Sequence, residues 1–324
     1  SIENIVKVPL ISNVTVSGFA TFLYNYPKLT YNIEVWHGGL SIKASGIMDK
    51  KDKNSGGNQA LYEKMDCMCV ASHLNKIVKS ACFGIPENKY RIVGLPRNDM
   101  LVLSDSRSNL ERLLETNLKG RKIIFNMPTF RRFDQNGRIE GSEELNGAFK
   151  IHNFNYEKFN GFLKDNNFIC ISKVHHGEEE SVGKGTRDRK YDHLFFINNN
   201  DLDNTNLSLY EVLGAGDILI TDYSTVYGDF LFMDKPIIFV NSDIEEYRNE
   251  RGLVLEPYDF WTAGPKVQCQ EKLQSEILRY QSDINYYKKE RERLLPVFFK
   301  YADANSSKRT WDIINEVFSG LSKI

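Results

Sequence analysis

The chain has 324 residues, and its 41% hydrophobic and 26% charged content is typical of a globular protein with room for two domains. Its 42 basic and 43 acidic side chains give a formal net charge of -1, so no overall basic field attracts nucleic acid. We therefore expect no nucleic-acid partner.

No apolar run approaches the roughly 20 residues that span a bilayer, and "SIENIVKVPL" lacks the features of a signal peptide. The chain starts at Ser1 rather than Met, which indicates a trimmed chain or a piece of a larger protein. Five cysteines include Cys67 and Cys69, which share one side of an expected strand and suit buried core positions. This use of cysteine favours a reducing, cytoplasmic compartment.

Residues 1–118 predict a first Rossmann-like lobe. Strands are expected in "NIVKVPLI", "NVTVSG", "YNIEVWHG", "CMCVAS" and "YRIVGLP". Helical patterns fill "QALYEKM" and "HLNKIVKSACFG", and the second of these ends at a glycine stop. Residues 94–99, "GLPRND", indicate a turn, and "SDSRSNLERLLETNL" predicts a helix that leads to the second half.

Residues 119–295 predict a second Rossmann-like lobe. Strands are expected in "KIIFNMP", "FICISKVHH", "HLFFIN", "DILITDY" and "KPIIFV", with a weaker candidate in "GLVLEP". Helices are expected in "NYEKFNGFLKD", "SLYEVLGAG" and "STVYGDFLFM". Short apolar runs that alternate with helices are typical of a parallel sheet covered on both faces, and such sheets bind ligands at the carboxyl ends of their strands.

The C-terminal region is expected to be helical. A long charged helix covers "QEKLQSEILRYQSDINYYKKERERLL" and is interrupted by Pro296, and residues 296–324 hold a helix that packs back on the lobes. The aromatic and basic residues of the long helix suit a membrane surface, but its interleaved acidic residues favour a solvated helix that covers the core. The expected fold is therefore α/β, with two lobes that face a central cleft.

A hydroxyl pair follows the apolar run "DILITD" at the point where a helix must begin. The unpaired N–H groups and partial positive charge of a helix N-terminus, together with the hydroxyls of Ser224 and Thr225, suit a phosphate. Simple N-capping by Asp222 or Ser224 explains the same pattern equally well.

Basic residues end two further strands of the second half. Lys173 and His175 lie on one side at the end of "FICISKVHH", whereas strand alternation turns His176 the other way. Arg131 and Arg132 follow "MPT" and suit a fork onto phosphate oxygens, with a solvated basic loop as the alternative.

In the first half, His37 ends a strand and is followed by two glycines, which let a substrate approach the backbone. A histidine titrates near neutrality and can take a proton from a hydroxyl nucleophile. The "DLD" at 201–203 has the spacing of a metal–nucleotide motif but lies in a polar stretch, and the six histidines show no zinc spacing. We expect no metal and no cofactor.

Six stretches occur in the order found in the CDP-glycerol glycerophosphotransferase family, which the chain resembles: "WHGGLSIK", "GLPRND", "MPTFRR", "KVHH", "YEVLGAGDILITDYSTVYGDFLFMDKPIIFV" and "RGL". This family comprises teichoic acid primases and polymerases and related capsule polymerases. The resemblance implies a GT-B-like fold, with a first lobe that looks short and incomplete. It implies transfer of a polyol phosphate, glycerol phosphate above others, from a CDP-polyol to a hydroxyl of the acceptor, with release of CMP.

The resemblance also implies roles for residues. His37 would be the general base, and His175 would contact the donor phosphates. Together with the strand ends, it implicates Arg131, Arg132, Lys173, Asp222, Ser224 and Thr225 on the donor side, and Trp36, Gly38, Lys43 and Arg97 on the acceptor side. The family usually has Thr where this chain has Gly39, and Pro where it has His176, which bears on the acceptor and polyol more than on the reaction.

The acceptor implied is an anionic, lipid-linked glycan met by basic residues such as Lys50, Lys51 and Lys53, so the enzyme would lie on the inner face of the cell membrane. Groups on the two lobes would meet only when the lobes close. Two alternatives stay open. One is a GT-B glycosyltransferase, which would release a nucleoside diphosphate, and the other is a non-catalytic nucleotide- or glycan-binding module of a larger polymerase.

Overall fold

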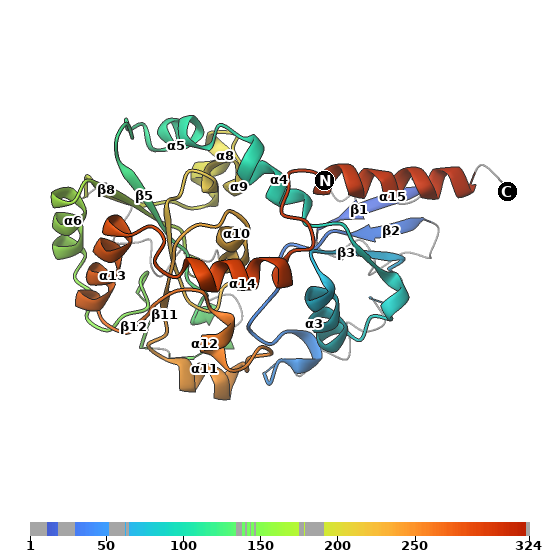
Figure 1. The fold of residues 1–324 in the computed structure, drawn as a ribbon, viewed down its shortest axis with the longest axis horizontal. Helices are drawn as coiled ribbons and strands as arrows, with labels where there is room; N and C mark the ends of the chain where they lie inside the picture. The colour runs from blue at the N-terminus through green and yellow to red at the C-terminus, as the bar shows by residue number, and fades with distance from the viewer. Residues whose placement is uncertain are drawn as a thin grey trace.

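The computed structural model describes residues 12–18, 30–51, 62, 65–133, 138–139, 141–142, 144–145, 147–174, 178 and 191–321. The expected strand in "NIVKVPLI" and most of the expected helix in "QALYEKM" lie outside these residues. Two parallel sheets organise the described chain (Figure 1). We call the part built on the four-stranded sheet the first lobe and the part built on the six-stranded sheet the second lobe.

The first lobe holds four parallel strands, in the order β1 (Val14–Ser17), β2 (Tyr31–Glu34), β3 (Cys67–Val70) and β4 (Tyr90–Ile92). Helix α3 (His73–Phe83) follows β3 directly. It begins where the Ser72 hydroxyl accepts a hydrogen bond from the Asn75 N–H, and it ends at Gly84, whose φ of 66° is the left-handed value that favours glycine. The expected glycine stop is therefore confirmed.

The C-terminal helix α15 (Ser306–Leu321) covers this first sheet. Ile313 and Ile314 of α15 share a buried cluster with Cys67 and Cys69 of β3. Figure 1 shows α15 running beside β1 and β2, far from the larger sheet. The last helix of the chain thus completes the lobe with which the chain begins, and both cysteines are core residues as predicted.

The second lobe holds six parallel strands in the order β12-β11-β10-β5-β8-β9. Their bounds are β5 Lys122–Asn126, β8 Phe168–Ser172, β9 Leu194–Phe196, β10 Ile218–Thr221, β11 Ile237–Val240 and β12 Lys266–Val267. Successive residues of β5 enter different cores, because side chains alternate along a strand. Ile123 and Phe125 pack with α5 (Ser106–Leu114), α9 (Leu209–Leu213) and α10 (Val226–Phe232), whereas Ile124 packs with α6 (Tyr156–Asp165) and α13 (Gln270–Ser282). Both faces are covered, which confirms the expected parallel α/β sheet.

The strand order reverses direction between β5 and β10. From β5 the chain adds β8 and β9 on one side, and it then returns to add β10, β11 and β12 on the other. Ligands of open parallel sheets bind outside the carboxyl ends of the strands at such a reversal. The loops after β5 and β10 are therefore the part of the second lobe where a ligand is expected.

The remaining elements are short connections around these layers. They are η2 (Gly46–Met48), η4 (Glu87–Lys89), α4 (Pro96–Leu103), the hairpin of β6 (Arg132–Phe133) and β7 (Arg138–Ile139), α8 (Asn199–Asn204), α11 (Ile244–Glu250), α12 (Tyr258–Trp261) and α14 (Lys288–Phe298). Helix α14 crosses between the lobes and packs against both α10 and α3 (Figure 1).

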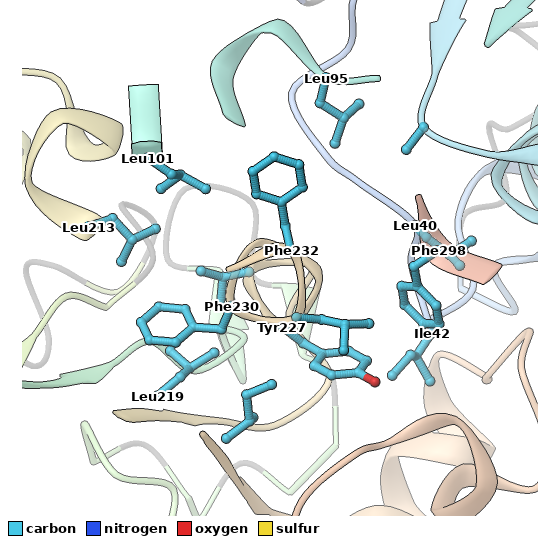
Figure 2. Packing of buried hydrophobic residues seen from close by; sticks show 14 of the residues in the cluster. Leu40, Ile42, Leu95, Leu101, Leu213, Leu219, Tyr227, Phe230, Phe232 and Phe298 are labelled. Carbon is cyan, nitrogen blue, oxygen red and sulfur yellow. The ribbon is translucent and has the colours of Figure 1, made fainter. Parts of the chain in front are cut away.

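The two lobes share one hydrophobic core. Leu40 and Ile42 of the first lobe belong to the same buried cluster as Tyr227 and Phe230 of α10, and Figure 2 shows these side chains around α10. Main-chain hydrogen bonds reinforce the contact: the Ala44 N–H donates to the Gly252 carbonyl (2.9 Å), and the Val254 N–H donates to the Ile42 carbonyl (2.8 Å). The lobes are in direct contact in this structure.

Several sequence-based expectations about elements are wrong. Residues 94–99 do not form a simple turn, because Pro96 is the first residue of α4 and its fixed φ suits that position. The long charged helix is two helices, α13 and α14, separated at Tyr287, which has a left-handed φ of 59°. Pro296 lies inside the last turn of α14, where only one hydrogen bond is lost. The stretch "GLVLEP" forms a single bridge to Lys43 instead of a strand, and β12 was not foreseen.

The predicted first lobe, residues 1–118, also includes a helix that packs elsewhere. Helix α5 lies against α9 of the second lobe, and its Leu110 and Leu114 share a core with Ile123 and Phe125 of β5. The apolar face of α5 has no first-lobe sheet to cover, since α15 occupies that position.

Candidate active site

A cleft of about 390 Å³ lies between the lobes. Its first-lobe wall includes Trp36, His37, Gly38, Gly39, Ser41, Lys43, Ser45, Val78, Lys79, Cys82 and Phe83, and its second-lobe wall includes Phe130, Ser224, Thr225 and Arg251. Six of the residues singled out from the sequence therefore line one cleft: Trp36, His37, Gly38, Lys43, Ser224 and Thr225.

His37 follows the carboxyl end of β2, and its imidazole is only partly exposed. Its Nδ1 lies 3.3 Å from the Gly18 carbonyl oxygen, which can only accept, so the neutral ring carries its proton on Nδ1 and Nε2 is the acceptor nitrogen. Partial burial lowers the pKa of His37 below the ordinary 6.5, and the nearby charges of Lys79, Arg97 and Lys43 act in the same direction. The ring is therefore neutral at pH 7 and able to take a proton.

The turn that presents His37 is held by a buried carboxyl group. Trp36 has a φ of 57°, a left-handed value that is uncommon for a bulky residue. The Trp36 N–H donates to Glu34 (2.7 Å), whose second oxygen accepts from the Ser17 hydroxyl (2.6 Å). Burial raises the pKa of Glu34 to about 7. Glu34 thus fixes the turn that aims the Trp36 and His37 side chains, whose rings lie 4.7 Å apart.

Arg97 contacts the main chain of His37 on the side away from the cleft lining. Its guanidinium donates to the His37 carbonyl and pairs with Asp229 of α10 (Nη2–Oδ1 3.4 Å), so it links the two lobes. The Tyr210 hydroxyl donates to the same carboxylate (2.7 Å), and the guanidinium stacks on the Tyr210 ring at 4.8 Å. Arg97 does not itself line the cleft, and its guanidinium already has these partners, so its expected contact with the acceptor stays a prediction.

Ser224 and Thr225 lie between β10 and α10, at the sheet reversal. Thr225 occupies the N-cap position of α10 without a side-chain capping bond. Within the described residues neither hydroxyl makes a hydrogen bond, and both side chains are partly exposed to the cleft. Neither Asp222 nor Ser224 caps α10 with its side chain, so the alternative of simple N-capping is wrong. Ser224 and Thr225 line the cleft on the second-lobe side, whereas the N–H groups of Tyr227 and Gly228 already donate to the Ser224 and Thr225 carbonyls (3.2 and 3.0 Å).

Arg131 and Asp222 do not reach the cleft, so the prediction that their side chains bind the donor is wrong. Both are 0% exposed, and Arg131 Nη1 lies 2.9 Å from Asp222 Oδ2. Arg131 Nε also lies 2.5 Å from Asp243, and the guanidinium stands over the rings of Tyr223 and Tyr247. This buried ion pair ties the loops after β5, β10 and β11 together and supports the turn that carries Ser224.

The other predicted donor residues lie partly outside the described chain. Lys173 follows β8 and is buried, with its N–H donating to the Asn126 carbonyl (3.0 Å), and it does not line the cleft. His175 and His176 lie outside the described residues, as does the side chain of Arg132. The proposed contact of His175 with donor phosphates stays a prediction.

The "DLD" stretch has a structural role. Asp201 forms a reciprocal capping box with Asn198 at the start of α8, so its carboxylate serves the helix terminus. Among the residues that the structure describes, no three His, Cys, Asp or Glu side chains gather closely enough to hold a metal ion. In the same residues, no helix is both long enough and apolar enough to cross a membrane.

Candidate site residues of the two lobes are already close to one another. The expectation that they come together only when the lobes close is therefore wrong for this conformation. A Cβ placed on Gly38 would lie 3.7 Å from Thr225 Cγ2, which is ordinary van der Waals contact. The shared core and the main-chain bonds at residues 42–44 hold the lobes at this distance.

Sequence reasoning missed three residues of this site: Glu34, Lys79 and Arg251. A signal for Lys79 existed, because it falls on the same helical face as the buried Asn75, Val78 and Cys82 of α3. Glu34 carried no comparable signal, and Arg251 was noted only as the first residue of "RGL", without a role. Arg251 pairs with Asp49 across the lobes (3.0 Å), a partner about two hundred positions away.

Two parallel-sheet lobes, with an imidazole of one and hydroxyls of the other lining a shared basic cleft, define a two-lobed α/β protein with a candidate active site between its lobes. Residues 9–316 match the family described as CDP-Glycerol:Poly(glycerophosphate) glycerophosphotransferase, and the chain belongs to this family. The family resemblance inferred from the sequence is therefore confirmed.

Curated relatives and solved structures agree with this membership. The chain is 29% identical over 310 residues to a teichoic acid glycerol-phosphate primase of Bacillus subtilis, covering 92% of this chain and 71% of the relative. It is 27% identical over 288 residues to a teichoic acid ribitol-phosphate polymerase of Staphylococcus aureus, covering 86% of this chain but only 46% of the relative. The structure of the wall teichoic acid polymerase TagF matches with a TM-score of 0.72 at 20% identity, covering 95% of this chain and 74% of that one. At that identity, the structural likeness shows the fold alone.

Proposed function

We propose that this chain transfers a polyol phosphate, with glycerol phosphate as the first choice, from a CDP-polyol to a hydroxyl of a teichoic-acid-like or capsular acceptor and releases CMP. The observation that carries the proposal is the single cleft in which His37 faces Ser224 and Thr225. Family membership supports the reaction class. The arrangement fits a GT-B-like pair of lobes, with the donor in the second lobe at the sheet reversal.

The reaction needs a nucleophile, a leaving group and charge stabilisation. The acceptor oxygen forms a new bond to the phosphorus that carries the polyol, and the bond from that phosphorus to CMP breaks. The Nε2 atom of His37 takes the proton of the acceptor hydroxyl as the new bond forms. The hydroxyls of Ser224 and Thr225 donate to the diphosphate oxygens, where negative charge develops.

The charge of the cleft fits anionic substrates. Lys43, Lys79 and Arg251 line it, and among the described lining residues none carries a carboxylate. Both a diphosphate donor and a polyanionic acceptor gain from such a wall. We propose that the acceptor is an anionic, lipid-linked glycan and that the enzyme works in the cytoplasm on the inner face of the membrane.

The test is to incubate the protein with a panel of CDP-polyols and candidate acceptors, and to identify the released nucleotide and the new linkage. The proposal expects CMP and a phosphodiester. Release of a nucleoside diphosphate from a nucleotide sugar would instead support a glycosyltransferase. No turnover with any CDP-polyol would support a non-catalytic binding module.

His37→Ala isolates the proposed base. It should abolish CMP release and leave the affinity for CDP nearly unchanged, because the imidazole lies on the wall opposite Ser224 and Thr225. The matched control is His152→Ala, which removes an exposed histidine outside the cleft and should leave both quantities unchanged. Turnover by His37→Ala near that of the control would remove His37 from the proposed role.

A further inference from the structure

Lys79 of α3 is a buried lysine that adds to the positive charge of the cleft but has no individual role in the proposed reaction. The residue is 4% exposed and lines the cleft. Its Nζ lies 4.7 Å from the centre of the Trp36 ring and 5.6 Å from that of Phe83. Within the described residues the ammonium has no ion pair and no hydrogen bond. Two aromatic faces are therefore its main contacts.

A charge in this position is costly without an anion. Removing an ammonium from water disfavours its charged form, and aromatic faces return only part of the lost solvation. Burial accordingly lowers the pKa of Lys79 to about 7; Arg97 lowers it further, while Cys82 and Glu34 oppose the shift. Glu34 is the nearby carboxyl group, but its oxygens already accept from Ser17 and from the Trp36 N–H. The cleft wall thus contains a buried amine that, once protonated, has no ion-pair partner among the described residues.

We propose that the Lys79 ammonium binds the phosphate of a polyol phosphate that lies in the cleft, beside the hydroxyl that His37 deprotonates. A phosphate offers strong acceptor oxygens to a point charge, and the rings of Trp36 and Phe83 supply a surface for the carbons of the polyol. The placement of this phosphate rests on the proposed function.

Two phosphates have this chemistry: that of the terminal unit of the acceptor and that of the unit carried by the donor. The ring of Trp36 lies 4.7 Å from the Lys79 ammonium and 4.7 Å from the His37 ring, so both groups belong to the first-lobe wall. The helix start at Ser224 and Thr225 belongs to the opposite wall. This placement favours the acceptor.

The experiment compares Lys79→Met with Lys76→Met. Methionine has a similar length, and because Lys79 has no ion pair within the described residues, its replacement leaves no buried carboxylate without a paired cation. Lys76 is on the same helix, but it pairs with Glu87 and does not line the cleft, so it is a matched control. Binding of sn-glycerol 3-phosphate and of CDP to the purified full chain is measured by calorimetry, with the thermal midpoint of each variant as a check on folding.

The expected result is that Lys79→Met binds glycerol 3-phosphate about 10- to 100-fold more weakly, the loss typical of one charge-assisted hydrogen bond, and binds CDP normally. Lys76→Met should match wild type for both probes. If Lys79→Met also bound CDP more weakly, at an unchanged thermal midpoint, the result would support the phosphate site but assign it to the donor. Unchanged binding of both probes by Lys79→Met would overturn the proposal, as would a wild-type chain that does not bind glycerol 3-phosphate.

These measurements need no turnover. If no CDP-polyol yields CMP while the loss of glycerol 3-phosphate binding still depends on Lys79, the proposed function fails and the phosphate site stands.

Discussion

Arg97→Lys should slow turnover without unfolding the protein. The Arg97 guanidinium serves the His37 carbonyl and the Asp229 carboxylate together, because its donors are arranged as a planar fork. A lysine keeps the positive charge beside buried Asp229 but offers a single ammonium on a flexible stem. We expect it to pair with Asp229 and to release the His37 carbonyl.

The size of the effect follows from the lost contact. A hydrogen bond from a charged donor contributes about 1.5–3 kcal/mol, which corresponds to a fall in kcat of about 10- to 100-fold if it acts through the position of His37. The unfolding free energy should fall by only about 1 kcal/mol, because Asp229 keeps a cation and the hydrogen bond from Tyr210.

The assay measures kcat and KM for CMP release from CDP-glycerol, with urea unfolding in parallel. Arg107→Lys is the matched control, because the Arg107 guanidinium also donates to the main chain, at the carbonyls of Leu118 and Arg121, but does not line the cleft. A wild-type kcat for Arg97→Lys would refute the reasoning. A raised KM for the acceptor with unchanged kcat would do so as well, since it would restore a direct acceptor contact.

Three further predictions concern other parts of the site. The acid limb of kcat/KM should have its midpoint below pH 6.5, because the pKa of His37 is lowered and the imidazole is lost as a base once it is protonated; a pH profile with a midpoint above 7 would contradict this. Arg131→Met should lower the unfolding free energy by about 3–5 kcal/mol, because Asp222 and Asp243 would stay buried without their cation, and a loss below 1 kcal/mol in urea unfolding would argue against the network. Ser224→Ala should weaken CDP binding by about two- to tenfold, the cost of one neutral hydrogen bond, and calorimetry that finds no change would place the diphosphate elsewhere.

Much of the fold was predictable because its sheets are buried on both faces. Runs such as "KIIFNMP" and "DILITDY" are apolar throughout, so they indicated strands, and the glycine after α3 marked its end. The same logic placed His37 and Ser224 at strand ends, and the structure brings both to one cleft.

The roles of other residues depend on contacts between distant parts of the chain, which no local sequence pattern reveals. Arg131 looked like a phosphate ligand because it ends a strand, yet its partner Asp243 lies 112 residues further on. Only the fold brings the Asp243 carboxylate to Arg131, in the loop after β5, and buries the two side chains together. Arg97 was placed on the acceptor side, and the sequence cannot show that it also pairs with Asp229 of the other lobe.

The pairing of residues 42–44 with 252–254 bears on how nucleotide enters and leaves. Swinging the lobes apart as rigid bodies would break these main-chain bonds and expose the core around Tyr227 to water. A wide hinge motion is therefore expensive in this chain. We expect exchange of CMP for a fresh donor to proceed through the mouth of the cleft, by rearrangement of side chains and nearby loops, so that viscosity and loop substitutions affect turnover more than changes to the seam between the lobes.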